Sequence, residues 1–134
     1  MIAKRQPKRI LIIDDDPDVV TYLETVLRDN GYEPICAADG AEGLRLARLH
    51  HPDLVCLDVV MPQPTGVRVF RELRDDRTLA GIPIVMVTGV QREFKDFIHH
   101  RRYYAPPDGY IAKPFDVAEL LATLQRLLAA PAPA

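Results

Sequence analysis

A fivefold alternation between short apolar runs and amphipathic stretches is the feature that most constrains the fold. Each run is four or five mostly apolar residues long, as expected for parallel strands that are covered on both faces. The stretches between the runs place apolar residues at helical spacing, as in Val19, Leu23 and Val26. Five strand–helix units in series predict an α/β fold with helices on both faces of a parallel sheet. The predicted strands cover residues 10–13, 33–37, 54–57, 84–87 and 109–112.

Capping residues indicate where four of the predicted helices begin. Asp16 precedes a proline at the first helical position, Pro17, and the first helix is expected to close at Gly31. Asp39 is followed three residues later by Glu42, as in a capping box. The candidate caps are therefore Asp16, Asp39, Thr65 and Asp116.

The third and fourth helices are predicted from their apolar stripes. The third is expected to bury Val67, Phe70 and Leu73. The fourth, over residues 90–102, carries an apolar stripe that begins at Val90, beside a basic one. That basic stripe is interpreted as a solvated helix face, with a partner surface as the alternative.

The length of 134 residues predicts one domain that is large enough to bury a core. We place it at residues 9–129, after a basic extension at 1–8 and before a Pro/Ala tail or linker stub at 130–134. The net charge of −2 favours neither nucleic acid nor an acidic membrane surface as the main partner.

Two features favour a cytoplasmic location without a membrane anchor. The first nine residues are basic but lack the apolar core of a signal peptide. No apolar run approaches the length of a membrane span, about 20 residues. In a reducing compartment Cys36 and Cys56 are expected to be free thiols that pack as small apolar side chains.

Side chains that can bind a ligand or take part in a reaction stand directly after four of the five predicted strands. They are Asp14 and Asp15 after the first strand, Asp58 after the third, Thr88 after the fourth and Lys113 after the fifth. Ligands of open parallel sheets bind at the carboxyl ends of the strands, where the strand order reverses. If the first and third strands are neighbours, the three carboxylates meet in that crevice.

Each of these residues has an ordinary structural role when it is considered alone. An aspartate after a strand is commonly a helix cap, which is the role we assign to Asp16. A single threonine is commonly a turn residue, and a single lysine a solvated charge. Asp58, however, is followed by two valines and stands well before a helix that begins near Gly66, so it is a poor cap. The joint occurrence of these residues at strand ends favours a shared site.

Three converging carboxylates repel one another unless a cation lies among them. Oxygen ligands with open positions suit Mg²⁺, which retains several waters and binds phosphate oxygens. A carboxylate can attack a phosphoryl group and form an acyl phosphate. The ammonium of Lys113 and the hydroxyl of Thr88 would then stabilise the negative charge of the transferring group. The residues therefore predict phosphoryl transfer to an aspartate.

Four segments of the chain resemble the signature segments of response-regulator receiver domains from two-component signalling systems. They are ILIIDDDPDVV, LVCLDVVMPQPTG, IPIVMVTG and GYIAKPF, in the order of that family. The resemblance extends from about Arg9 to Ala129. It implies a doubly wound, flavodoxin-like (βα)5 fold with strand order 2-1-3-4-5.

The resemblance also implies a role for each site residue. Asp58 matches the phosphorylated aspartate, and Asp14 and Asp15 match the acidic pair. Asp15, Asp58 and the backbone carbonyl of Val60 would ligate Mg²⁺, with Asp14 acting largely through water. The catalytic roles belong to Thr88, whose hydroxyl turns toward the phosphoryl group, and to Lys113, which pairs with the acceptor and then with the phosphate. Thr88 also belongs to the switch, together with Tyr110, whose rotamer follows that of Thr88.

Further expectations follow from the same resemblance. The Lys113–Pro114 peptide bond should be cis. Cys36 and Cys56 should lie on strands separated by the first strand, too far apart for a disulfide. The phosphodonor would be a sensor histidine kinase or a histidine phosphotransfer protein. The domain would be a monomer or weak dimer that switches a downstream protein partner or output domain, without turnover and without direct nucleic-acid binding.

Two departures from the family pattern lie within the predicted domain, and a third is that no output domain follows the fifth helix. Thr65 stands where the family often has an aspartate, and its hydroxyl can still cap a helix. The segment between Thr88 and Lys113 is longer than usual, and residues 103–107 replace the common small residues.

Two other functions fit part of the pattern. A haloacid-dehalogenase-like phosphatase would use Asp14-x-Asp16, but it needs a further acidic pair late in the chain, where only one helix and the tail follow Lys113. A docking module with the receiver fold and no phosphotransfer is the second alternative. A flavin or nucleotide binder is not favoured, because the chain has no GxGxxG and no P-loop.

Overall fold

The strands and helices alternate along the chain as predicted. The computed structural model describes residues 6–89 and 106–129, apart from the side chain of Thr88, so the predicted helix over 90–102 lies outside the described residues. The elements are β1 (Arg9–Ile13), α1 (Pro17–Asp29), β2 (Glu33–Ala37), α2 (Gly40–His50), β3 (Leu54–Asp58), α3 (Gly66–Asp75), β4 (Ile84–Thr88), β5 (Gly109–Ala112) and α5 (Val117–Ala129).

All five strands form one parallel sheet in the order β2-β1-β3-β4-β5, which confirms the predicted flavodoxin-like topology. Ile12 of β1 is paired with Cys36 on one side and with Cys56 on the other. The two thiols therefore stand two strand spacings apart, roughly 10 Å. Both cysteines are free, as predicted.

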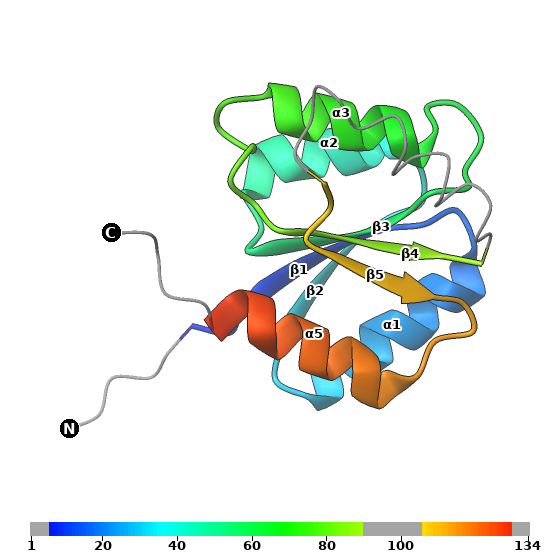
Figure 1. Cartoon of the computed structure of the whole chain (residues 1–134), viewed down its shortest axis with the longest axis vertical. Coiled ribbons are helices and arrows are strands. Elements are labelled where there is room, and N and C mark those ends of the chain that lie inside the picture. Colours follow the sequence, from blue (N-terminus) through cyan, green and yellow to red (C-terminus); the bar gives the residue numbers. More distant parts are fainter. Residues whose placement is uncertain (1–5, 90–105, 130–134) are drawn as a thin grey trace.

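Helices cover both faces of the sheet, with α2 and α3 on one face and α1 and α5 on the other (Figure 1). Successive residues of a strand point to opposite faces, so β1 contributes Leu11 and Ile13 to the core beneath α2 and α3. Ile10 and Ile12 belong to the core beneath α1 and α5. Since both faces are buried, every position from Ile10 to Ile13 must be apolar.

The helix ends agree with the predicted caps. Asp16, Asp39 and Thr65 accept hydrogen bonds from backbone N–H groups of the first turns of α1, α2 and α3. The side chain of Asp116 does the same for the first turn of α5. Gly31 follows the end of α1 in the left-handed conformation, at φ 85°. Within the described ranges, none of the helices combines the length and the apolar character that crossing a membrane requires.

The buried face of α3 differs from the prediction at one position. Phe70 and Leu73 are buried as expected, but Val67 is only half-buried at the edge of the core. Val69 takes the fully buried position instead. This follows from a helix that begins at Gly66, because positions three, four and seven residues later then share one face.

Arg74 joins three segments at the edge of the sheet opposite the carboxyl ends of the strands. Its side chain is 10% exposed, and its guanidinium lies 4.9 Å from the centre of the Phe70 ring. The guanidinium donates to the carboxylate of Asp108 at 3.0 Å, and the same carboxylate accepts from the backbone N–H of Ile84 at 2.8 Å. The Arg74 guanidinium also donates to the backbone carbonyls of Ala80, Ile82 and Pro106. Arg74 therefore fixes the starts of β4 and β5 to α3.

Replacing Asp108 by alanine should lower the free energy of unfolding by about 2–3 kcal/mol, because it leaves the Ile84 N–H without a partner and removes the carboxylate that pairs with the Arg74 guanidinium. Urea unfolding followed by circular dichroism measures this loss. The exposed Asp29→Ala variant is the control and should stay within about 0.5 kcal/mol of the wild type. Equal stability of the two variants would contradict the assigned role of the cluster.

Candidate active site

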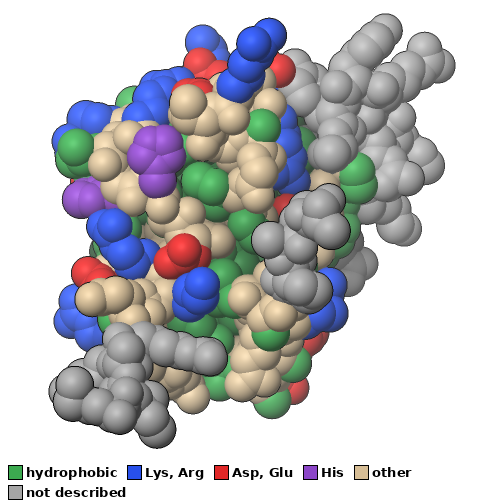
Figure 2. Space-filling view, turned by 90° about the vertical axis from the view of Figure 1, so that its left-hand side faces the viewer, with side chains coloured by type: hydrophobic (Ala, Val, Ile, Leu, Met, Phe, Trp, Pro, Cys, Tyr) green, Lys and Arg blue, Asp and Glu red, His purple; other side chains and the backbone are tan. Residues whose placement is uncertain are grey.

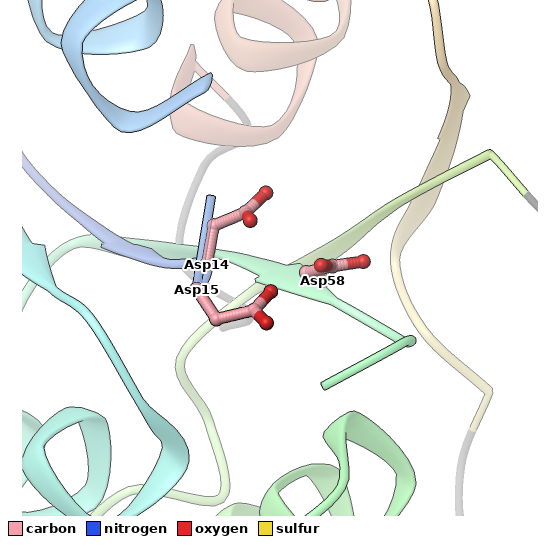
Figure 3. A group of neighbouring side chains, drawn as sticks. All are labelled: Asp14, Asp15 and Asp58. Carbon is pink, nitrogen blue, oxygen red and sulfur yellow. The ribbon is translucent and has the colours of Figure 1, made fainter. Parts of the chain in front are cut away.

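Three carboxylates converge at the carboxyl ends of two neighbouring strands, β1 and β3 (Figure 3). Asp14 directly follows β1, and Asp58 is the last residue of β3. Asp14 and Asp58 are buried, with 2% and 5% of their surface exposed to solvent, whereas Asp15 is exposed. One oxygen from each carboxylate lies within 4.8 Å of the others. The crevice expected from the sequence is therefore present.

Backbone groups next to the strand ends hold the two buried carboxylates. Oδ1 of Asp14 accepts from the N–H of Asp16 at 2.9 Å, and the N–H of Asp14 itself donates to the carbonyl of Ala37 on β2. Oδ1 of Asp58 accepts from the N–H of Val60 at 3.1 Å. Each acid thus has one oxygen fixed by the turn that follows its strand.

Lys113 directly follows the carboxyl end of β5 and supplies the positive charge of the crevice. Its Nζ lies 2.8 Å from Oδ2 of Asp14 and 3.6 Å from Oδ2 of Asp58. The resemblance implied a lysine paired with the acceptor, and the shorter of its two contacts is to Asp14. The Lys113–Pro114 peptide bond is cis, as predicted.

Burial and like charge make Asp58 harder to ionise than an ordinary aspartate. Burial raises the pKa of Asp58, and the neighbouring charges of Asp14 and Asp15 raise it further, to about 6. Lys113 and the N–H of Val60 act in the opposite direction. Burial alone would lower the pKa of Lys113, but its ion pairs with Asp14 and Asp58 raise it above the usual value. At neutral pH the Asp58 carboxyl group is therefore mostly ionised, beside the Lys113 ammonium.

This donor set fits Mg²⁺ by its chemistry and by its dimensions. All three side-chain ligands are carboxylate oxygens, which hard divalent cations prefer. An octahedral Mg²⁺ needs ligand oxygens roughly 2.9 Å apart when adjacent and roughly 4.1 Å apart when opposite. The carboxylate oxygens lie within 4.8 Å of one another, which is the same order of distance. A divalent cation would also neutralise the excess negative charge.

The other predicted site residues occupy positions around this crevice. Thr88 ends β4 and pairs with Ala112, while its side chain lies outside the described part of the chain. Val60 is 43% exposed beside the acceptor. Tyr110 lies within β5 and packs, half-buried, against the core beneath α2 and α3. The structure thus brings the acids and Lys113 together and leaves the arrangement of the Thr88 hydroxyl untested.

The comparisons with known proteins identify the family. A family model described as the response regulator receiver domain matches residues 10–125. The chain is a response regulator receiver domain. The family assignment sets aside the dehalogenase hypothesis, and the docking-module alternative stays open within the receiver fold.

Individual relatives agree with this assignment. The receiver is 36% identical to the protein PilH of Pseudomonas aeruginosa over 121 residues, which cover 90% of this chain and 98% of PilH. It is 36% identical to PhoP of Bacillus subtilis, a transcriptional regulatory protein of alkaline phosphatase synthesis, over 90% of this chain and 48% of PhoP. The chain thus spans about half the length of several curated relatives that it matches.

One similar solved structure is described with a bound metal ion. The receiver domain of a sensor histidine kinase from Pseudomonas aeruginosa, described with a magnesium ion in its active-site cleft, is 30% identical to this chain. The two superpose with a TM-score of 0.83, over 93% of this chain and 100% of that domain.

The raised pKa of Asp58 predicts how stability changes with pH. The folded-state pKa is about 6, whereas an aspartate in an unfolded chain titrates at about 3.9. Between these values the folded receiver binds more protons, so its free energy of unfolding falls as pH rises from about 4 to about 6. The metal-free Asp58→Asn variant should lack this fall and exceed the wild type above about pH 6 by no more than about 3 kcal/mol.

Urea unfolding in a metal chelator across this pH range measures the effect. The exposed Glu33→Gln variant is the matched control and should follow the wild type at every pH. Parallel pH profiles for wild type and Asp58→Asn would contradict the assigned electrostatics.

Proposed function

We propose that this receiver accepts a phosphoryl group on Asp58 in a Mg²⁺-dependent reaction and thereby acts as a signalling switch. The observation that carries the proposal is the meeting of Asp58 with Asp14, Asp15 and Lys113 in one crevice. A pKa of about 6 keeps the Asp58 carboxylate mostly ionised at neutral pH, so it is available as a nucleophile.

In the proposed reaction a carboxylate oxygen of Asp58 attacks the phosphorus of the donor. The new O–P bond gives an aspartyl phosphate, while the N–P bond of a phosphohistidine donor breaks and its electron pair returns to the imidazole. Asp15, Asp58 and the carbonyl of Val60 would hold Mg²⁺, which supplies positive charge for the phosphoryl oxygens. Lys113 would exchange part of its contact with the acids for the phosphoryl group.

The switch would run through residues at the ends of β4 and within β5. By the family resemblance, the Thr88 hydroxyl turns toward the phosphoryl group and the Tyr110 ring follows it. Tyr110 lies half-buried at the edge of the core beneath α2 and α3. The partner that reads this change would be a separate protein or an output domain.

The proposed donor is a sensor histidine kinase or a histidine phosphotransfer protein, acting in the cytoplasm. The receiver would comprise residues 9–129, with 1–8 as an extension and 130–134 as a tail or linker stub. Its nearly full-length match to PilH is compatible with a stand-alone regulator, and its match to half of PhoP with a part of a longer one. We propose a monomer or weak dimer without direct nucleic-acid binding.

Incubation with acetyl phosphate should label the wild type only when Mg²⁺ is present, and Asp58→Asn should not be labelled. Intact-protein mass measures the labelling. Asp16→Asn is a matched control near the same crevice and should be labelled normally, because asparagine also caps helices well. Undiminished labelling of Asp58→Asn would exclude Asp58 as the acceptor. A wild type that folds and binds Mg²⁺ but takes no phosphate would favour the docking module.

By the family resemblance, the side chains two residues past the acceptor and two past the threonine flank the approach of water, and here they predict a long-lived phosphoryl group. Hydrolysis requires a water in line with the Asp58–phosphorus bond, and a polar neighbour can orient that water. The positions two residues past the acceptor and past the threonine are Val60 and Val90, both branched and apolar. Val60 is exposed beside the acceptor, and Val90 lies outside the described residues. Neither side chain can accept a hydrogen bond.

Placing polar groups at both positions should therefore shorten the phosphoryl lifetime. We expect the Val60→Asn, Val90→Glu double variant to lose its phosphate roughly tenfold faster than the wild type, or more. The rate is measured by mass after the phosphodonor is removed. Equal decay of the two proteins would show that another feature controls the access of water.

A further inference from the structure

Gly66, the first residue of α3, lies directly against the backbone of the acceptor strand end. A β-carbon at this position would overlap the carbonyl oxygen of Asp58 and would approach Cα of Val59 to 2.6 Å. The N–H of Gly66 donates to the carbonyl of Val59 at 3.2 Å. The first turn of α3 and the backbone of residues 58–59 are therefore in contact without any side chain between them.

The need for glycine here is a need for space. The φ angle of Gly66 lies outside the left-handed region, so its backbone conformation alone would accept alanine. The atoms that a β-carbon would meet belong to the backbone, which cannot change rotamer as a side chain can. Gly81 is the opposite case, because a β-carbon there would meet nothing within 4 Å.

The backbone that Gly66 touches is also the one that orients the acceptor. The N–H of Val60 holds Oδ1 of Asp58, and the carbonyl of Val60 is the proposed backbone ligand of Mg²⁺. A displacement of residues 58–59 would move both groups, because the peptide unit of Val60 follows directly. Groups that orient metal ligands commonly change metal affinity when they are altered, although they do not touch the ion.

We infer that Gly66 is a positioning residue of the acceptor site. Because it has no side chain, Gly66 lets α3 pack against Asp58 and Val59. This contact positions the backbone of Val60, whose N–H binds the Asp58 carboxylate and whose carbonyl is the proposed Mg²⁺ ligand. The inference rests on the proposed function of Asp58, and it concerns the residue that holds the acceptor in place.

The test compares Mg²⁺ affinity in three folded variants by calorimetric titration. Gly66→Ala should weaken Mg²⁺ binding roughly tenfold or more. Gly81→Ala is the matched glycine control and should bind as the wild type does. Leu27→Ala removes a buried side chain in the half of α1 remote from the crevice, so it should lower the melting temperature without weakening Mg²⁺ binding.

Wild-type Mg²⁺ affinity in Gly66→Ala would overturn the inference, and so would an equal loss in Leu27→Ala at a similar melting temperature. If Gly66→Ala does not fold, amide hydrogen exchange of the wild type decides. The amides of Gly66 and Val60 should then be protected more strongly than that of the exposed Gly81, and unprotected amides would overturn the inference. If the wild type is not labelled on Asp58 but Gly66→Ala weakens Mg²⁺ binding as expected, the proposed function is refuted and the inference about Gly66 is not.

Discussion

The structure of the site depends on the electrostatic cost of holding three carboxylates together at one sheet edge. Two of them, Asp14 and Asp58, are almost fully buried, and burial of a charge is costly unless the charge is paired. Lys113 offsets part of this cost through its short contact with Asp14. Burial and the remaining negative charge raise the pKa of Asp58, and the same charge makes the crevice able to hold a metal ion.

The fold makes this arrangement possible by bringing distant parts of the chain to one edge. The strand order places β3 beside β1, so Asp14 and Asp58 follow neighbouring strands although 44 positions separate them in the sequence. Lys113 is 99 positions from Asp14 and reaches it from the edge strand β5. Figure 2 views the molecule from a direction at right angles to that of Figure 1, on the side where the strands begin. The proposed chemistry therefore lies on the side of the molecule that faces away from the viewer in Figure 2.

Local sequence patterns predicted the strands, the helix caps and the acidic site, because each depends on nearby residues. Continuous apolar runs indicate strands that are buried on both faces, and Asp16, Asp39 and Thr65 cap helices that follow them directly. The strand order came from the family resemblance, since a local pattern does not say which strands are neighbours. The buried position of Val69 was missed because it depends on where α3 begins.

The contacts that the sequence did not predict depend on how formed segments pack against one another. The Arg74 cluster depends on how α3 packs against the start of β5, and the fit of Gly66 depends on the path of the backbone after β3. Neither leaves a periodic signal. A glycine before a helix is also common for other reasons, so its steric role becomes visible only when the neighbouring backbone is known.

Chemical identification of the phosphorylated residue tests the central claim most directly. Borohydride reduces an aspartyl phosphate to homoserine, and peptide mass spectrometry then locates the converted residue. After phosphorylation in Mg²⁺ the account predicts homoserine at position 58 and unmodified aspartates at positions 14 and 15. Homoserine at either of those two positions, or phosphate retained on a residue that borohydride leaves unchanged, would contradict it.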